Sequence, residues 1–419
     1  MAIYLKNATY IDWQTLAFKT GHLRVEEGPG GTVEWVGSCL ADAVDCQGKL
    51  VTKAFACGHH HIYSALARGM PPPEKKPVNF YEILKYIWWH LDKRLDLDMI
   101  RASALVSALY CAKNGVTFVI DHHASPFSVT GSLETIAQAF DQVGVGHLLC
   151  YELSDRDGPG SREAGLKETE QYLQNRQGLV GLHASFTVGD DLLKRAVALA
   201  ASYDSGVHAH VAEDPIDEAF TLKKYGYRVL PRLQKAGALD FSKTILAHCL
   251  HLDDEERAVL ADSNAYIVQN VESNINNEVG TFTAKELPSE RIMLGTDGMH
   301  SDMIRSAQWT HFHCKAIDNL DLTAAYRRLR NVHNYLQANG YKGDGENNLV
   351  ILDYDAPTPV YQDNWLGHFF YGLAASHVRH VIAGGRWLVK DRTVLTVDED
   401  SVLAFAREQA QRLWEKLVR

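Results

Sequence analysis

Histidine and carboxylate side chains that could bind a metal ion are spread between positions 59 and 297 of the chain. Each follows a short apolar run, at a point where a strand would end. They are His59-His60-His61, His183, His210 with Glu213, His248 and Asp297. Neutral imidazoles and carboxylates that converge from several chain segments are the usual ligands of zinc and related ions. Their order along the chain therefore predicts one metal site of the kind that hydrolases use to activate water.

Within the histidine triplet, His59 and His61 are the natural pair for one ion. Alternate residues on a strand point to the same face, so His60 points to the opposite face. A tract of surface histidines would normally have polar neighbours, whereas residues 54–58 and 62–66 are mostly apolar.

The other groups are weaker signals when each is taken alone. Glu213 lies three residues beyond His210, from where it could reach water on a metal bound by that histidine. It could equally cap a helix that begins near Pro215. His248 suits a core histidine and Asp297 a turn aspartate. The joint arrangement is what favours a catalytic site.

Composition excludes several classes of partner. With 419 residues and a net charge of -10, the chain has no basic surplus for nucleic acid or an anionic membrane. No apolar stretch approaches the roughly 18 residues of a membrane span, and the N-terminus lacks the apolar core of a signal peptide. The seven cysteines form no CxxC pair. We therefore expect reduced thiols and a cytoplasmic protein.

The pattern of apolar runs predicts a (β/α)8 TIM barrel. Between residues 54 and 345, apolar runs such as 117–120, 244–248 and 292–295 alternate with helical patterns. Doubly buried strands that alternate with helices form parallel sheets, and about eight of them close into a barrel. Residues 1–53 and 346–419 have short-strand texture, so we expect one small β-sandwich domain from both termini, with a terminal helix. The catalytic groups would lie at the carboxyl ends of the barrel strands.

The motifs then resemble a known family. A His-x-His on strand one, His210-x-x-Glu213 on strand five, His248 on strand six and Gly-Thr-Asp297-Gly on strand eight resemble the amidohydrolase superfamily over nearly the whole chain. The stretches YSALARG (63–69), DHHASP (121–126), LHASFTV (182–188) and GTDGM (295–299) are similar to its SsnA-type aminohydrolases. That branch is related to cytosine, guanine and chlorotriazine hydrolases.

The resemblance implies one divalent ion, zinc before iron or manganese, bound by His59, His61, His210 and Asp297. It implies a deaminase in which metal-bound hydroxide attacks an aminated nitrogen heterocycle, purine-like by preference. Asp297 accepts the proton of the attacking hydroxide. Glu213 protonates the ring nitrogen and assists the departing ammonia, while His248 stabilises developing negative charge.

Four further side chains are predicted around the substrate. The resemblance places His183 in the binding site, and Arg68 either contacts substrate or fixes its loop. Trp88, on an insertion after strand one, could stack on a flat ring or belong to a buried or oligomeric contact. His122, at the end of strand two, could face the cavity, and a second metal there is the alternative. The resemblance also implies a homodimer.

Other functions stay open on the sequence. The same site could hydrolyse a cyclic amide or a carbon–halogen bond, or the chain could be a non-catalytic relative. The absence of a CxxC motif excludes the zinc deaminases that use one. Two departures from the family affect loops: Lys53-Ala54-Phe55-Ala56 replaces the usual Pro-Gly lead-in, and Val271 replaces a proline.

Overall fold

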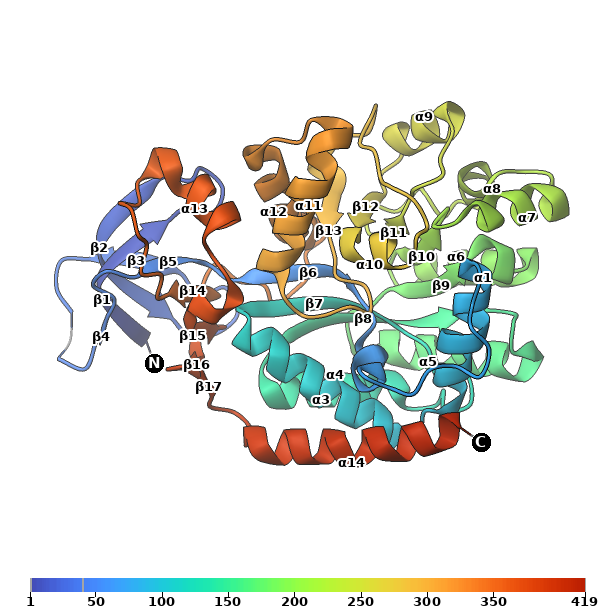
Figure 1. The fold of residues 1–419 in the computed structure, drawn as a ribbon, viewed down its shortest axis with the longest axis horizontal. Helices are drawn as coiled ribbons and strands as arrows, with labels where there is room; N and C mark the ends of the chain where they lie inside the picture. The colour runs from blue at the N-terminus through green and yellow to red at the C-terminus, as the bar shows by residue number, and fades with distance from the viewer. Residues whose placement is uncertain (1, 40, 419) are drawn as a thin grey trace.

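Eight parallel strands follow one another in chain order around a nearly closed barrel (Figure 1). The computed structural model describes residues 2–39 and 41–418. The barrel strands are β6 (Phe55–His60), β7 (Val116–His123), β8 (Gly146–Leu153), β9 (Val180–Ala184), β10 (Val207–Val211), β11 (Ile245–His248), β12 (Tyr266–Gln269) and β13 (Ile292–Leu294). The last strand meets the first where the amides of Thr296 and Asp297 donate to the His59 carbonyl at 3.0 and 3.1 Å. The predicted barrel is confirmed.

Helices connect the strands and surround the barrel (Figure 1). They are α1 (Phe80–Ile83), α2 (Trp89–Leu91), α3 (Leu97–Lys113), α4 (Ser132–Val143), α5 (Gly158–Asn175), α6 (Asp190–Ser202), α7 (Pro215–Tyr225), α8 (Val229–Lys235), α9 (Asp254–Asp262), α10 (Val271–Asn276), α11 (Met303–Asp318) and α12 (Leu322–Ala338). With helices outside and packed side chains inside, the strands are buried on both faces, as all eight residues of β7 are. This double burial explains why the strands read as continuous apolar runs.

A second, mixed sheet joins the two ends of the chain. Its nine strands are β1 (Ala2–Ile11), β2 (Phe18–Glu26), β3 (Val33–Val36), β4 (Val44–Asp45), β5 (Leu50–Lys53), β14 (Leu349–Leu352), β15 (Val378–Ala383), β16 (Arg386–Lys390) and β17 (Thr393–Val394). The N-terminal and C-terminal parts meet where β5 pairs antiparallel with β14. The predicted β domain from both termini is confirmed, and the limits of the domains stay a prediction.

Two more helices complete the chain. The helix α13 (Trp365–Tyr371) packs against α11 and α12, and α14 (Glu399–Leu417) runs along α3 under the barrel (Figure 1). The Trp414 indole on α14 donates to the Leu66 carbonyl at 2.8 Å, just beyond the histidine triplet. The C-terminal helix therefore supports the segment that leaves β6.

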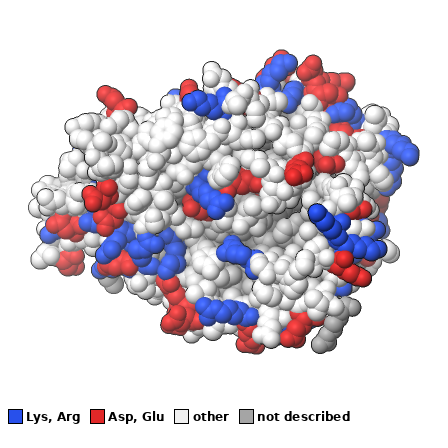
Figure 2. Space-filling view, viewed as in Figure 1, with Lys and Arg blue, Asp and Glu red and all other residues white. Residues whose placement is uncertain are grey.

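The surface is mixed in charge. Acidic and basic side chains are interspersed on the face seen in Figure 2. Among residues 2–39 and 41–418, no helix combines the length and apolarity that crossing a membrane requires.

Candidate metal centre and active site

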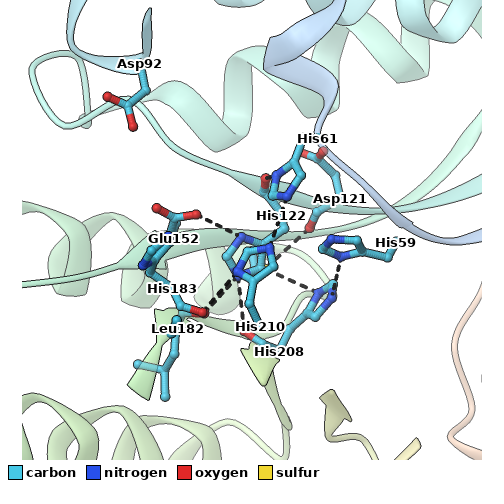
Figure 3. Close-up of polar contacts among 12 residues, drawn as sticks. His59, His61, Asp92, Asp121, His122, Glu152, Leu182, His183, His208 and His210 are labelled. Atoms are coloured by element: carbon cyan, nitrogen blue, oxygen red, sulfur yellow. Dashed lines mark hydrogen bonds and ion pairs between the residues drawn. The ribbon is translucent and has the colours of Figure 1, made fainter. Parts of the chain in front are cut away.

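Side chains from four strand ends meet at the carboxyl mouth of the barrel. The Nε2 atom of His61 lies 3.1 Å from that of His210 and 3.1 Å from Asp297 Oδ1. The Nε2 atom of His59 lies 3.7 Å from the same carboxylate oxygen. Figure 3 shows these histidine rings turned toward one another from different strands. The structure thus brings together residues that are up to 238 positions apart, between His59 and Asp297.

The orientation of each imidazole is fixed through its other nitrogen. The Nδ1 atom of His61 donates to the His122 carbonyl at 2.6 Å, and that of His210 donates to the His183 carbonyl at 3.0 Å. Because carbonyl oxygens only accept, both rings carry a proton on Nδ1, and each ring in its neutral form presents a lone pair at Nε2. Hydrogen bonds of this kind orient metal-binding histidines in proteins.

These lone pairs fit a cation. When both rings are neutral, the Nε2 lone pairs of His61 and His210 face each other at 3.1 Å, an arrangement that a cation between them would stabilise. The Nε2 atoms of His59 and His248 are buried and have no hydrogen-bond partner among the described residues. Ligand atoms of His59, His61 and His210 lie within 4.8 Å of one another, and so do those of His59, His248 and Asp297. The donor set suits zinc or a related ion.

The strand ends hold these side chains in strained backbone. His248 has a φ of 74° and Asp297 a φ of 53°, in the left-handed region that ordinary residues rarely adopt. Ala212, two residues after His210, has a φ of 46°. Strain of this kind clusters at functional sites, where the surrounding structure holds it in place.

Two carboxylates at the mouth have opposite tendencies to bind a proton. Burial, followed by the charge of Asp297, raises the pKa of Glu213 well above its ordinary value. Burial also acts to raise the pKa of Asp297, but His59 and His61 outweigh it and hold that pKa well below its usual range. Glu213 Oε2 and Asp297 Oδ2 lie 3.7 and 3.9 Å from His248 Nε2. A proton donor and a proton acceptor therefore flank one imidazole.

A cavity with an aromatic wall opens over this centre. The segment after β6 contributes Phe80, Leu84, Trp88 and Trp89 to the wall, and His183 also lines the cavity. The ring centroids of Trp89 and His183 are 5.8 Å apart. Burial lowers the pKa of His183 to about 4, so the ring is neutral near pH 7. The cavity suits a flat, largely apolar ring.

The structure does not bring Arg68 or His122 to the cavity surface. The Arg68 guanidinium lies 5.6 Å from the centroid of the Tyr110 ring. His122 is fully buried behind the wall, with Nε2 at 3.2 Å from the carbonyl oxygens of both Leu182 and His208. Because these contacts occupy both side chains, we assign neither of them a direct contact with substrate.

Sequence reasoning missed two residues at the centre. His208 lies two positions before His210, and its Nε2 is 2.9 Å from Nδ1 of His59 (Figure 3). Glu152, near the end of β8, lines the cavity. Both carried a readable signal: His208 forms a second His-x-His, and Glu152 is a charged residue at the end of an apolar run.

Comparison with known proteins identifies the family. A family model described as the Amidohydrolase family matches residues 50–388. The chain belongs to this family. Family members depend on metal, and the predicted resemblance is confirmed.

Amidohydrolases similar to this chain include two named deaminases. The 5'-deoxyadenosine deaminase of Methanocaldococcus jannaschii is 26% identical, over 90% of this chain and 91% of the relative. The 5-methylthioadenosine/S-adenosylhomocysteine deaminase of Halothermothrix orenii is 26% identical, over 98% and 100%.

Solved structures share the fold. An adenosine deaminase from Xanthomonas campestris with bound zinc aligns with a TM-score of 0.84 at 19% identity, covering 98% of each chain. Guanine deaminase from E. coli aligns with a TM-score of 0.76 at 18% identity, covering 93% of this chain and 99% of the other.

Proposed function

We propose that this amidohydrolase is a hydrolytic deaminase that releases ammonia from an aminated nitrogen heterocycle with a purine-like ring. The observation that carries the proposal is the pair Glu213 and Asp297, one poised to donate a proton and the other to accept one, beside converging imidazole lone pairs. Relatives named as deaminases of adenosine derivatives support the reaction class.

One zinc ion would be held by His59, His61, His210 and Asp297. Zinc would make hydroxide available at neutral pH, because it lowers the pKa of a bound water to about 7. Iron and manganese also bind nitrogen and oxygen donors of this kind.

The protein's own groups then move the protons. Asp297 takes the proton of the attacking water on Oδ2, which faces His248 and accepts a hydrogen bond from Ser273 Oγ at 2.5 Å. Glu213 donates its proton to the ring nitrogen beside the attacked carbon. Asp297 then passes its proton to the amino group, the bond from this carbon to nitrogen breaks and ammonia leaves. The proton that remains on the attacking oxygen returns to Glu213 as the carbonyl forms. His248, whose Nδ1 donates to Asn274 Oδ1 at 2.8 Å, stabilises the charge that develops on the attacking oxygen when its Nε2 is protonated.

Location and assembly complete the proposal. We place the protein in the cytoplasm, because its cysteines are free thiols. We expect a homodimer that binds a small heterocycle and neither nucleic acid nor membrane. Sedimentation of the zinc-loaded protein checks the dimer.

Ammonia release tests the function. Zinc-reconstituted protein is incubated with aminopurines, aminopterins, aminopyrimidines and aminotriazines, and ammonia is measured by a coupled assay. We expect release from at least one ring class, and a loss of about 10²–10⁴-fold in kcat with Glu213→Gln. Glu163→Gln, on the exposed face of α5, is the matched control and should keep full activity. Zinc-loaded protein that releases no ammonia from any ring would contradict the proposal.

A further inference from the structure

The cavity wall beside the metal centre carries a second group of buried charges, which the hydrolytic steps do not use. Glu152 and Asp92 line the cavity, and Arg156 lies behind them. The exposed fractions of the three side chains are 4%, 2% and 9%. Charges buried to this degree are costly unless they are paired or meet a ligand. These three side chains are therefore a fixed structural part of the cavity wall.

The contacts of Glu152 leave capacity for another donor. Arg156 Nη2 lies 3.3 Å from Glu152 Oε1. On the other side, His122 Nδ1 lies 3.4 Å from Glu152 Oε2 (Figure 3). Both contacts are long, while a carboxylate offers about four lone-pair sites. Asp92 is paired with Arg156 through Oδ2, and its Oδ1 has no partner among the described residues. Glu152 thus presents a hydrogen-bond acceptor with spare capacity at the cavity wall.

A second metal ion bound at Glu152 is a poorer explanation of these buried charges than a ligand with N–H groups. Ligand atoms of His122, Glu152 and His210 do lie within 4.8 Å of one another. However, His210 uses Nδ1 on the His183 carbonyl, and its one free nitrogen already faces His61 at 3.1 Å. Only two ligands are left for a second ion, and Arg156 already supplies positive charge beside Glu152. N–H donors of a ligand suit the site better.

The charge state of Glu152 also favours an N–H donor as its partner. Burial acts to raise the pKa of this carboxyl, but His183, His122 and Arg156 outweigh burial and hold the pKa below its usual range. Arg156 also lies 5.2 Å from the Trp89 ring centroid, so one guanidinium holds both the acceptor and an aromatic wall residue. An ionised acceptor therefore lies next to the surface on which a flat ring would pack.

We propose that Glu152 is a specificity-determining residue that accepts N–H hydrogen bonds from the heterocycle. The preferred substrates then carry a second N–H donor, an amino group or a ring N–H, besides the amine that is lost. A carboxylate oxygen of Glu152 lies within 4.8 Å of the His210 ring nitrogen, so one small ring at the metal centre can reach both. This inference rests on the proposed function for the position of the ring.

Equilibrium binding tests the inference without turnover. Calorimetry of zinc-loaded Glu213→Gln protein compares 2,6-diaminopurine with adenine, and 2,4-diamino-1,3,5-triazine with 2-amino-1,3,5-triazine. We expect the diamino ring of each pair to bind about tenfold more tightly, the size of one charge-assisted hydrogen bond. Adding Glu152→Gln should reduce that ratio to about twofold or less, and Glu152→Asp should restore part of it. Glu168→Gln, a buried glutamate outside the cavity, should leave the ratio unchanged.

Each outcome is decisive. Equal binding of the two rings by Glu213→Gln protein overturns the inference before any Glu152 variant is made. A ratio that survives Glu152→Gln also overturns it. A loss of one of two zinc equivalents in Glu152→Gln protein would instead establish a second metal site. If the protein prefers the diamino rings but the wild-type protein releases no ammonia, the deaminase proposal is overturned and the binding site is retained. If no ring binds, both proposals are overturned.

Discussion

At the scale of single residues, the metal centre depends on what each histidine does with its second nitrogen. His61 and His210 use backbone carbonyls, and His248 uses Asn274. His59 differs, because its Nδ1 meets the ring of His208 at 2.9 Å. With Nδ1 of His59 as the donor, Nε2 of His208 accepts and its Nδ1 faces the Cys150 thiol at 3.6 Å. This assignment puts one proton on Nδ1 of His59 and one on Nδ1 of His208.

We predict that His208→Leu lowers zinc affinity by about 10–100-fold, the usual effect of removing a partner of a metal-bound histidine. Without His208, the His59 ring loses the acceptor that holds its Nε2 toward the centre. Competition with a chelating dye measures the change. His60→Gln is the matched control, because His60 is equally buried but points away to Ser301 Oγ at 3.2 Å. Wild-type affinity in the His208 variant would refute the role.

At the scale of elements, the barrel strands must approach one another closely for their ends to meet. A Cβ atom on Gly295, just after β13, would lie 2.4 Å from Asn270 Oδ1 and 2.8 Å from the His59 carbonyl. The same carbonyl accepts the amides of Thr296 and Asp297 that close the barrel. Only a residue without a side chain allows this closure directly beside the metal centre.

Gly295→Ala should therefore damage stability and metal binding together. We expect a loss of about 1–3 kcal/mol in the free energy of unfolding, as for other overpacked sites, with weaker zinc binding. Urea unfolding and dye competition measure the two effects. Gly160→Ala, in α5 with no atom within 4 Å of the added Cβ, should leave both nearly unchanged. Equal behaviour of the two variants would show that closure tolerates a methyl group.

At the scale of the whole molecule, a buried charge cluster joins the barrel to the terminal β domain. Lys53 Nζ donates to the Gly345 carbonyl at 2.8 Å and lies 3.6 Å from Asp344. His333 on α12 donates through Nδ1 to Asp344 Oδ2 at 2.7 Å, while Arg330 lies 3.4 Å from its Nε2. This arrangement needs a neutral His333, since a proton on Nε2 would face a guanidinium.

The cluster predicts a loss of stability in acid. Burial lowers the pKa of His333 below its ordinary 6.5, so its contribution to stability is complete above that pH and is lost as the pH falls toward the folded-state pKa. We expect the urea midpoint of zinc-loaded protein to fall between about pH 7.5 and about pH 5.5. His333→Gln should show a smaller fall, because one titrating group is removed. If the urea midpoint falls equally in both proteins, the acid sensitivity comes from other histidines and not from His333.

Much of the fold could be read from the sequence because burial leaves a local trace. Strands covered on both faces become unbroken apolar runs, so β7 and β11 were predictable, and so was their alternation with helices. The candidate ligands could be read for the same reason, since polar residues such as His210 and Asp297 interrupt these runs where strands end. Trp88, for which the sequence left a flat ring or a buried or oligomeric contact open, lines the cavity.

Residue types and their positions on strand ends were thus determined by the sequence alone. The tertiary structure decided which atoms are available, because the partners of each side chain come from other strands. The carbonyl of His122 on β7 orients His61 from β6, and the carbonyl of His183 on β9 orients His210 from β10. Neighbouring-strand contacts also bury His122 and leave Glu152 facing the cavity. Such contacts depend on strand order and register, which no local pattern in the chain records.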